Sequence, residues 1–116
     1  MASVLSSKHH SIECIVDYSP DELPDEFSWV DQGVVTSVKN QGHCGSCYAF
    51  AAISALESQY LIHYEDDNVD LSEQAMIDCV SNGCSGGHSY NVYDYIKEEG
   101  VPEEEEVPYL EEVLFA

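Results

Sequence analysis

The residues best suited to chemistry in this sequence lie between Gln41 and Phe50. This stretch reads Gln-Gly-His-Cys-Gly-Ser-Cys-Tyr-Ala-Phe and leads directly into an apolar run with helical spacing. A thiol at such a junction lies near the first backbone N–H groups of a helix, where the helix dipole favours its anionic form. Cys47 is therefore the candidate nucleophile. The side-chain amide of Gln41, six residues upstream, is the candidate hydrogen-bond donor to an oxyanion.

Three predicted helices and one loop must position these groups. The strongest helix spans about residues 46–63, because its large apolar residues recur at spacings of three and four: Phe50, Ile53, Leu56, Tyr60 and Tyr64. A second helix begins within residues 71–74, with Ser72 as its N-cap. A third spans residues 89–99 and ends at Gly100. Residues 82–87 form a glycine-rich loop that another chain can approach closely.

The segment before the first helix is harder to interpret. We expect Trp29 and Val30 to pack, and residues 34–38 to form an extended or short β segment. Glu57 lies beside Ile53 and Leu61 in the helical array, and two interpretations of it stay open. It is either an exposed carboxylate or a buried, hydrogen-bonded one.

Composition excludes several classes of function. The chain has 116 residues, enough for one small domain, and carries 3 Lys+Arg against 23 Asp+Glu, for a net charge of −20. This charge repels nucleic acids and anionic membranes, so we expect neither as a partner. The acid excess is either solvated surface or an adaptation to an acidic compartment. No apolar stretch is long enough to span a membrane, and no pattern indicates a metal or a cofactor.

Cysteine usage and the start of the sequence point in different directions. Five cysteines in a short chain suggest an oxidising compartment, and the odd number leaves at least one thiol without an intramolecular partner. The first 18 residues contain no apolar core of a signal peptide. The simplest reconciliation is that the sequence is part of a longer product or that its start is misplaced.

The motif from Gln41 to Phe50 resembles the active-site segment of papain-like cysteine proteases, the family that includes the cathepsins. Further motifs follow in that family's order: residues 24–29, 33–40, 71–74, 78–79, 83–87, 95–96 and 108–109. The resemblance covers residues 23–110 and is weakly nearest to the digestive members from mites. It implies an α+β family, of which this chain contains mainly the helical left half, with little or no β-sheet. Residues 1–22 are then a polar N-terminal arm, and residues 111–116 a divergent tail.

The resemblance also implies roles for individual residues. Cys47 is the expected nucleophile, and the Gln41 side chain and the Cys47 N–H form the expected oxyanion hole. Cys44 is expected to pair with Cys84. The expected substrate-binding residues are Gly45, Ser46, Gly86, Gly87 and His88. The implied partners are a peptide or protein substrate and a cystatin-like inhibitor, and the implied location is extracellular, lysosomal or vacuolar.

Departures from the family's pattern limit the expected activity. The catalytic His and Asn of this family lie about 130–150 residues after the cysteine, whereas 69 residues follow Cys47 here. We therefore expect the β-rich right domain to be absent and the chain alone to be inactive. A relay through His88 is a minor alternative to that expectation. Without the right domain, the cleft side of the first helix is expected to form an exposed apolar patch.

Two further departures concern single residues. Tyr48 replaces the family's usual Trp, so its hydroxyl needs a hydrogen-bond partner. Cys79 lacks its usual disulfide partner, and it is either paired with Cys14 or a free thiol. Besides a peptidase fragment, the alternatives are a non-catalytic truncated paralogue that binds peptides or inhibitors, and a product with no stable fold.

Overall fold

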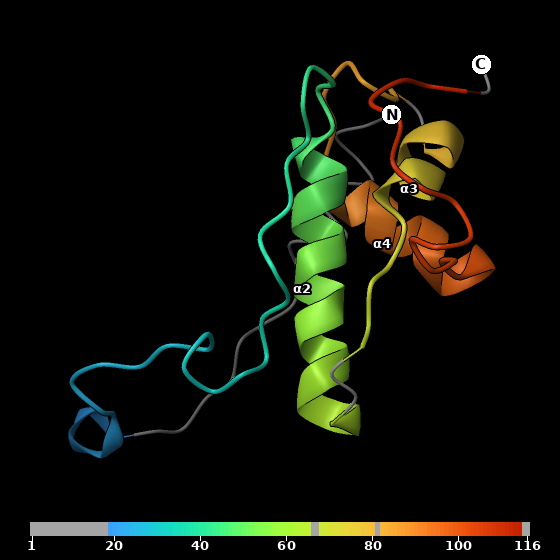
Figure 1. Ribbon diagram of the computed structural model, residues 1–116. Helices are drawn as coiled ribbons and strands as arrows, with labels where there is room; N and C mark the ends of the chain where they lie inside the picture. Colours follow the sequence, from blue (N-terminus) through green and yellow to red (C-terminus); the bar gives the residue numbers. More distant parts are fainter. Residues whose placement is uncertain (1–18, 66–67, 81, 115–116) are drawn as a thin grey trace.

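The computed structural model describes residues 19–65, 68–80 and 82–114. Its elements are a 3-10 turn, η1 (Pro20–Glu22), and three α-helices, α2 (Cys47–Tyr64), α3 (Glu73–Cys79) and α4 (Ser89–Glu99) (Figure 1). In the described ranges there is no strand, only two isolated bridges, between Gly45 and Ser85 and between Leu71 and Glu103. The expected helical half with little or no sheet is therefore confirmed.

The helix boundaries agree closely with those predicted from spacing. Helix α2 begins and ends one residue later than predicted, and α4 has the predicted bounds. Ser72 caps α3 as expected, because its hydroxyl accepts the Ala75 N–H at 3.1 Å. Gly100 ends α4 with a φ of 81°, a conformation that glycine adopts without strain.

Helix α2 runs through the centre of the molecule, with α3 and α4 packed on one flank (Figure 1). The core between these helices is small and consists of Cys44, Tyr48, Ala49, Ala52, Ile53, Met76, Ile77 and Val92. The small alanines of α2 let the neighbouring helices approach closely. None of the helices in the described ranges has the length and apolar character needed to cross a membrane.

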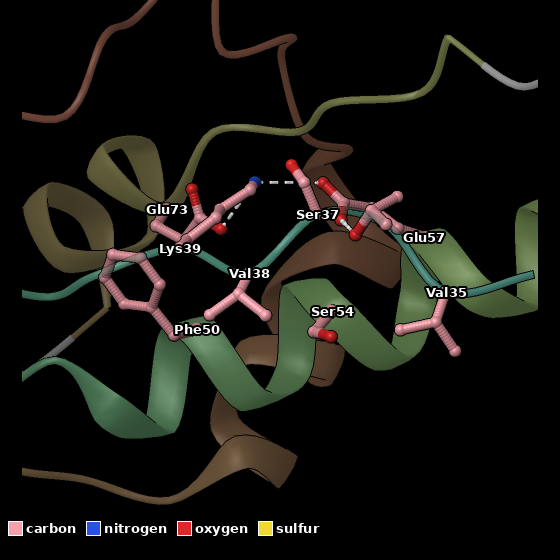
Figure 2. A pocket seen from close by; sticks show the side chains of 9 residues that line it. Val35, Ser37, Val38, Lys39, Phe50, Ser54, Glu57 and Glu73 are labelled. Carbon is pink, nitrogen blue, oxygen red and sulfur yellow. Dashed lines mark hydrogen bonds and ion pairs between the residues drawn. The ribbon is translucent and has the colours of Figure 1, made fainter. Parts of the chain in front are cut away.

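The segment before α2 runs along the other flank of that helix as irregular extended chain, with no ladder pairing within the described residues. Lys39 attaches it to the body, because its ammonium contacts the carboxylates of Glu57 and Glu73 (Figure 2). A pocket of about 260 Å³ lies here, lined by Val35, Thr36, Ser37, Val38, Lys39, Phe50, Ser54, Glu57 and Glu73.

The prediction that Trp29 and Val30 pack is wrong. Trp29 is 54% exposed and Val30 67% exposed. The Trp29 ring meets only the Phe27 ring among the described aromatic residues, edge-on with centroids 4.8 Å apart. Trp29 lines an open pocket together with Leu61 and Ile62 of α2, so it lies near the end of that helix while more than half of its surface stays exposed.

Candidate active site

Cys47 is the first residue of α2, and its thiol is free and exposed. The first N–H groups of a helix have no acceptor within the helix, and the helix dipole is positive at this end. The N–H and the thiol of Cys47 therefore both lie at the positive end of α2. This placement confirms the prediction that Cys47 stands at a helix start, and its role as a nucleophile stays a prediction. The helix begins at Cys47 because the chain turns at Gly45 and Ser46 before it enters α2.

Gln41 is half-buried, and its side chain is held in one orientation. Its amide nitrogen donates to the Cys44 carbonyl at 2.9 Å. An amide nitrogen carries two hydrogens, so this bond orients the group and leaves a second N–H for another acceptor. The short turn between Gln41 and Cys47 thus contains both groups that acyl-transfer chemistry needs on the nucleophile side.

Ser46 does not have the role expected of it. It was predicted to line a substrate cleft, but it is 0% exposed. Its hydroxyl lies 2.8 Å from the hydroxyl of Tyr109, and it does not cap α2 although it occupies the N-cap position. An inward partner 63 residues away in sequence therefore turns this side chain into the core.

A disulfide joins Cys44 to Cys84, as the resemblance implied, and ties the active-site turn to the glycine-rich loop. Backbone hydrogen bonds reinforce this connection: the Gly45 N–H donates to Cys84 O at 2.8 Å, and the Gly86 N–H donates to Gly45 O at 2.9 Å. A side chain at position 45 would collide with the Cys84 carbonyl. Closing a loop of 40 residues is worth about 4 kcal/mol in the chain-entropy model.

Tyr48 supports the same loop from inside the core. Its hydroxyl donates to Gly83 O at 2.6 Å, which confirms the expectation that this group needs a partner. Its ring lies 3.1 Å from the position that a Cβ would take at Gly87. Burial raises the pKa of the Tyr48 phenol, and the nearby Cys47 adds to the effect.

Glu57 is fully buried, which decides between the two interpretations of it. Its carboxylate accepts from Thr36 Oγ1 at 2.6 Å, Lys39 Nζ at 3.1 Å and the Leu71 N–H at 2.8 Å. The sequence patterns pointed to neither Lys39 nor Thr36 as its partner. A single lysine preceding an acid-rich helical region was the only available signal.

Lys39 is shared among three carboxylates, those of Glu57, Asp70 and Glu73, at 2.8–3.1 Å. Burial lowers the pKa of Lys39, but the hydrogen bonds with these carboxylates outweigh it and raise the pKa above its ordinary value. Burial raises the pKa of Glu73 despite the opposing effect of Lys39. The two pKa shifts agree with each other. Lys39 is stabilised by three carboxylates, whereas each carboxylate shares that one cation with two others.

Comparison with known proteins identifies the family. The sequence model described as "Papain family cysteine protease" matches residues 23–113. This chain belongs to the papain family of cysteine proteases. Cysteine proteinase 1 of Entamoeba histolytica is 43% identical over 100 residues, which cover 81% of this chain and 32% of that protein. The viral cathepsin of Autographa californica nuclear polyhedrosis virus is 46% identical over 98 residues, covering 82% of this chain and 30% of that protein.

The fold agrees with solved structures of the family. The bromelain protease from Ananas comosus, solved in complex with the E64 inhibitor, matches with a TM-score of 0.74 and 40% identity. That match covers 80% of this chain and 44% of the bromelain chain. The chain therefore has the helical part of the papain-like fold, and it spans about a third of the length of the curated relatives it matches.

None of the histidines in the described part of this papain-family chain is bonded to Cys47. His43 is exposed in the turn before the nucleophile, and His63 lies about 24 Å along α2, at 1.5 Å per residue. His88 is exposed on the glycine-rich loop, and its ring stacks on that of Tyr90 with centroids 5.2 Å apart. The candidate nucleophile and the candidate oxyanion donor thus lie in one turn, without a bond from Cys47 to any described histidine.

Cys79 is a free, exposed thiol at the end of α3. A hydrogen bond from the Tyr95 phenol to Cys79 is the main reason why the pKa of Tyr95 is raised. The conjectured pairing of Cys79 with Cys14 falls on a residue outside the described ones, as do His9 and His10.

Proposed function

We propose that this chain is the nucleophile-bearing half of a papain-type cysteine endopeptidase. One observation carries the proposal: the free, exposed thiol of Cys47 begins α2, and the Gln41 amide is oriented next to the same turn. Roles in peptide-bond hydrolysis follow from this arrangement and from family membership.

In the proposed reaction, the Cys47 thiolate attacks the carbonyl carbon of a peptide bond. The carbonyl electrons move to the oxygen, and the Gln41 amide and the Cys47 N–H stabilise the oxyanion that forms. Collapse of this intermediate expels the amine, which must receive a proton as it leaves. In this family an imidazole supplies that proton, and no described histidine is bonded to Cys47. The chain alone therefore forms covalent adducts but does not turn over peptides.

An extended peptide is the proposed substrate. The Gly86 N–H already donates to Gly45 O, so it is not available to a substrate strand. Gly87 is half-buried, and its main-chain groups make no hydrogen bond within the described residues. Gly87 is therefore the proposed edge to which the peptide main chain pairs. The stacked rings of His88 and Tyr90 would stand beside the peptide side chain.

A second candidate function is a non-catalytic module that binds peptides or a cystatin-like inhibitor. The observation that favours it is the intact cleft wall, from the disulfide to Gly87, without a histidine partner for Cys47. For either function we propose an extracellular, lysosomal or vacuolar location, because the Cys44–Cys84 disulfide persists in oxidising compartments.

The test uses the purified chain, a dipeptide aldehyde and a fluorogenic peptide. We expect the aldehyde to form a reversible adduct with the wild type, and neither Cys47→Ala nor the wild type to release fluorophore. His88→Ala should bind the aldehyde like the wild type. Turnover that His88→Ala abolishes would replace this proposal with a relay through His88. Absence of any adduct with a folded wild-type chain would contradict the proposed peptidase half.

A further inference from the structure

We propose that Tyr109 is a positioning residue for the oxyanion site, acting through the main chain of Gln41 and the side chain of Ser46. This inference rests on the function proposed above. Tyr109 lies 62 residues after Cys47 in the sequence and does not belong to the turn that carries the reactive groups. It reaches that turn only in the folded chain.

A single phenol oxygen connects the two ends of the turn. The Tyr109 hydroxyl lies 2.5 Å from Gln41 O and 2.8 Å from Ser46 Oγ. A carbonyl oxygen only accepts, so the phenol proton goes to Gln41. The Ser46 hydroxyl must then donate to the phenol oxygen. The result is two hydrogen bonds in series, in which Ser46 donates to Tyr109 and Tyr109 donates to Gln41.

These two hydrogen bonds explain why Ser46 is buried and why it does not cap α2 with its side chain. Serine at an N-cap position ordinarily accepts an N–H of the first turn. Here its hydroxyl serves the phenol, and its other acceptor, Cys44 O, is distant at 3.4 Å. A stabilising local interaction has been replaced by a contact that spans the active-site turn.

Tyr109 is itself firmly held. Its ring meets Phe50, in the first turn of α2, edge-on with centroids 4.9 Å apart. Its N–H donates to the Glu104 carboxylate at 2.8 Å, and the next N–H, of Leu110, donates to Gln74 Oε1 at 2.9 Å. The phenol is therefore a fixed reference point between α2 and α3.

The turn needs such a reference point. Gly42 has a φ of 64°, and glycines leave a backbone free to adopt other conformations. The disulfide and the Gly45 hydrogen bonds hold the middle of the turn, whereas Tyr109 holds its two ends. Those ends carry the Gln41 amide and precede the Cys47 N–H, the two proposed oxyanion donors.

The experiment separates oxyanion stabilisation from thiol reactivity. The hemithioacetal formed with a dipeptide aldehyde places an oxygen in the oxyanion site, whereas alkylation by iodoacetamide transfers a carbon to sulfur without an oxyanion. For Tyr109→Phe we expect aldehyde affinity to fall about tenfold, part of the 10²–10³ effect of deleting a donor outright. The iodoacetamide rate should stay within about twofold, because ordinary alkylation does not use the donors. Tyr64→Phe, which alters an exposed tyrosine at the far end of α2, is the matched control.

Two further variants make the test decisive. In a Gln41→Ala background, Tyr109→Phe should lower aldehyde affinity by less than it does in the wild type, because only its effect through Ser46 on the Cys47 N–H remains. Ser46→Ala, which keeps the phenol and removes its donor, should cause a smaller selective loss and serves if Tyr109→Phe does not fold. Circular dichroism establishes that each variant is folded.

The outcomes distinguish the two proposals. If Gln41→Ala weakens the aldehyde adduct but Tyr109→Phe and Ser46→Ala behave like Tyr64→Phe, only the positioning inference fails. An equal loss of aldehyde affinity and iodoacetamide rate would reveal a merely structural role and would also overturn it. If the wild type binds no aldehyde, the proposed function fails and the inference fails with it.

Discussion

The two flanks of α2 differ sharply in how far their side chains are covered. On the flank that faces α3 and α4, Ala49, Ala52 and Ile53 are all 0% exposed. On the other flank, Cys47 and Ala55 are exposed, and Val38 of the neighbouring segment is 100% exposed. The second flank is also the more polar one, because Ser54, Glu57 and Ser58 follow Cys47 along it.

The exposed residues on the second flank agree with the fact that this chain matches only part of the length of its relatives. The chain spans about a third of the length of its curated relatives, and the apolar patch expected on the cleft side of the helix stays a prediction. The covered flank holds the reactive turn in place through the disulfide, Tyr48 and Tyr109. The other flank, along which the segment before α2 runs, presents the thiol of Cys47. One side of this helix packs against the core, and the other exposes the candidate nucleophile to solvent.

The largest expected effect on stability comes from the polar contact that joins Thr36 and Lys39 to Glu57 of α2. Glu57→Ala removes the acceptor of Thr36, Lys39 and the N–H of half-buried Leu71. We expect it to lower the free energy of unfolding by about 3 kcal/mol, since uncompensated buried polar groups are costly. Urea unfolding measures this, with the exposed Glu98→Ala as control. Equal midpoints for the two variants would show that the segment is not held through Glu57.

A matched pair of valines tests the two flanks directly. Val92 is 0% exposed in the covered core, whereas Val38 is fully exposed. Val92→Ala should cost about 2 kcal/mol of unfolding free energy, because buried methyl groups are lost. Val38→Ala should change it by less than about 0.5 kcal/mol. A comparable loss in both variants would mean that the second flank is covered in solution, and a native mass measurement would show whether a second copy covers it.

The smallest expected effect is on pH dependence. Burial raises the pKa of Glu73 above its ordinary value of 4.5. Between 4.5 and the raised value, the folded chain binds more protons than the unfolded chain, so the free energy of unfolding rises as the pH falls toward 4.5. This contribution is lost as the pH rises through the raised pKa.

Glu73→Gln should therefore flatten the dependence of the urea midpoint on pH above 4.5. Exposed Glu98→Gln, which removes the same charge, controls for the repulsion that a net charge of −20 creates. A slope identical in the two variants would exclude Glu73 as the source. The opposite change, a steeper slope in Glu73→Gln, would mean that Lys39 outweighs burial.

Local features were predictable because neighbouring residues determine them. The bounds of α2 and α4 follow from apolar spacing, and the Ser72 cap follows from residue type. Cys47 at a helix start was predictable for the same reason. The pairing of Cys44 with Cys84 came from family resemblance, since spacing alone allows other pairings.

Long-range contacts were not predictable. Lys39 meets Glu57 across 18 residues of sequence, and Tyr109 meets Gln41 across 68. The family resemblance implied that Ser46 lines the cleft beside Cys47. Its burial depends on Tyr109, which no local pattern connects to it. Trp29 was expected to pack, but more than half of its surface is exposed, and its ring meets only that of Phe27 among the described aromatic residues.

The sequence by itself determined the helices, the reactive thiol at the start of one of them, and the family. These depend on periodicity, residue type and motif, which act over a few positions. Only the tertiary structure decided which polar groups are buried and what holds Gln41 in place. A buried carboxylate or hydroxyl is stable only where its partners converge, and that convergence exists only after α2, α3 and the Tyr109 segment have packed together.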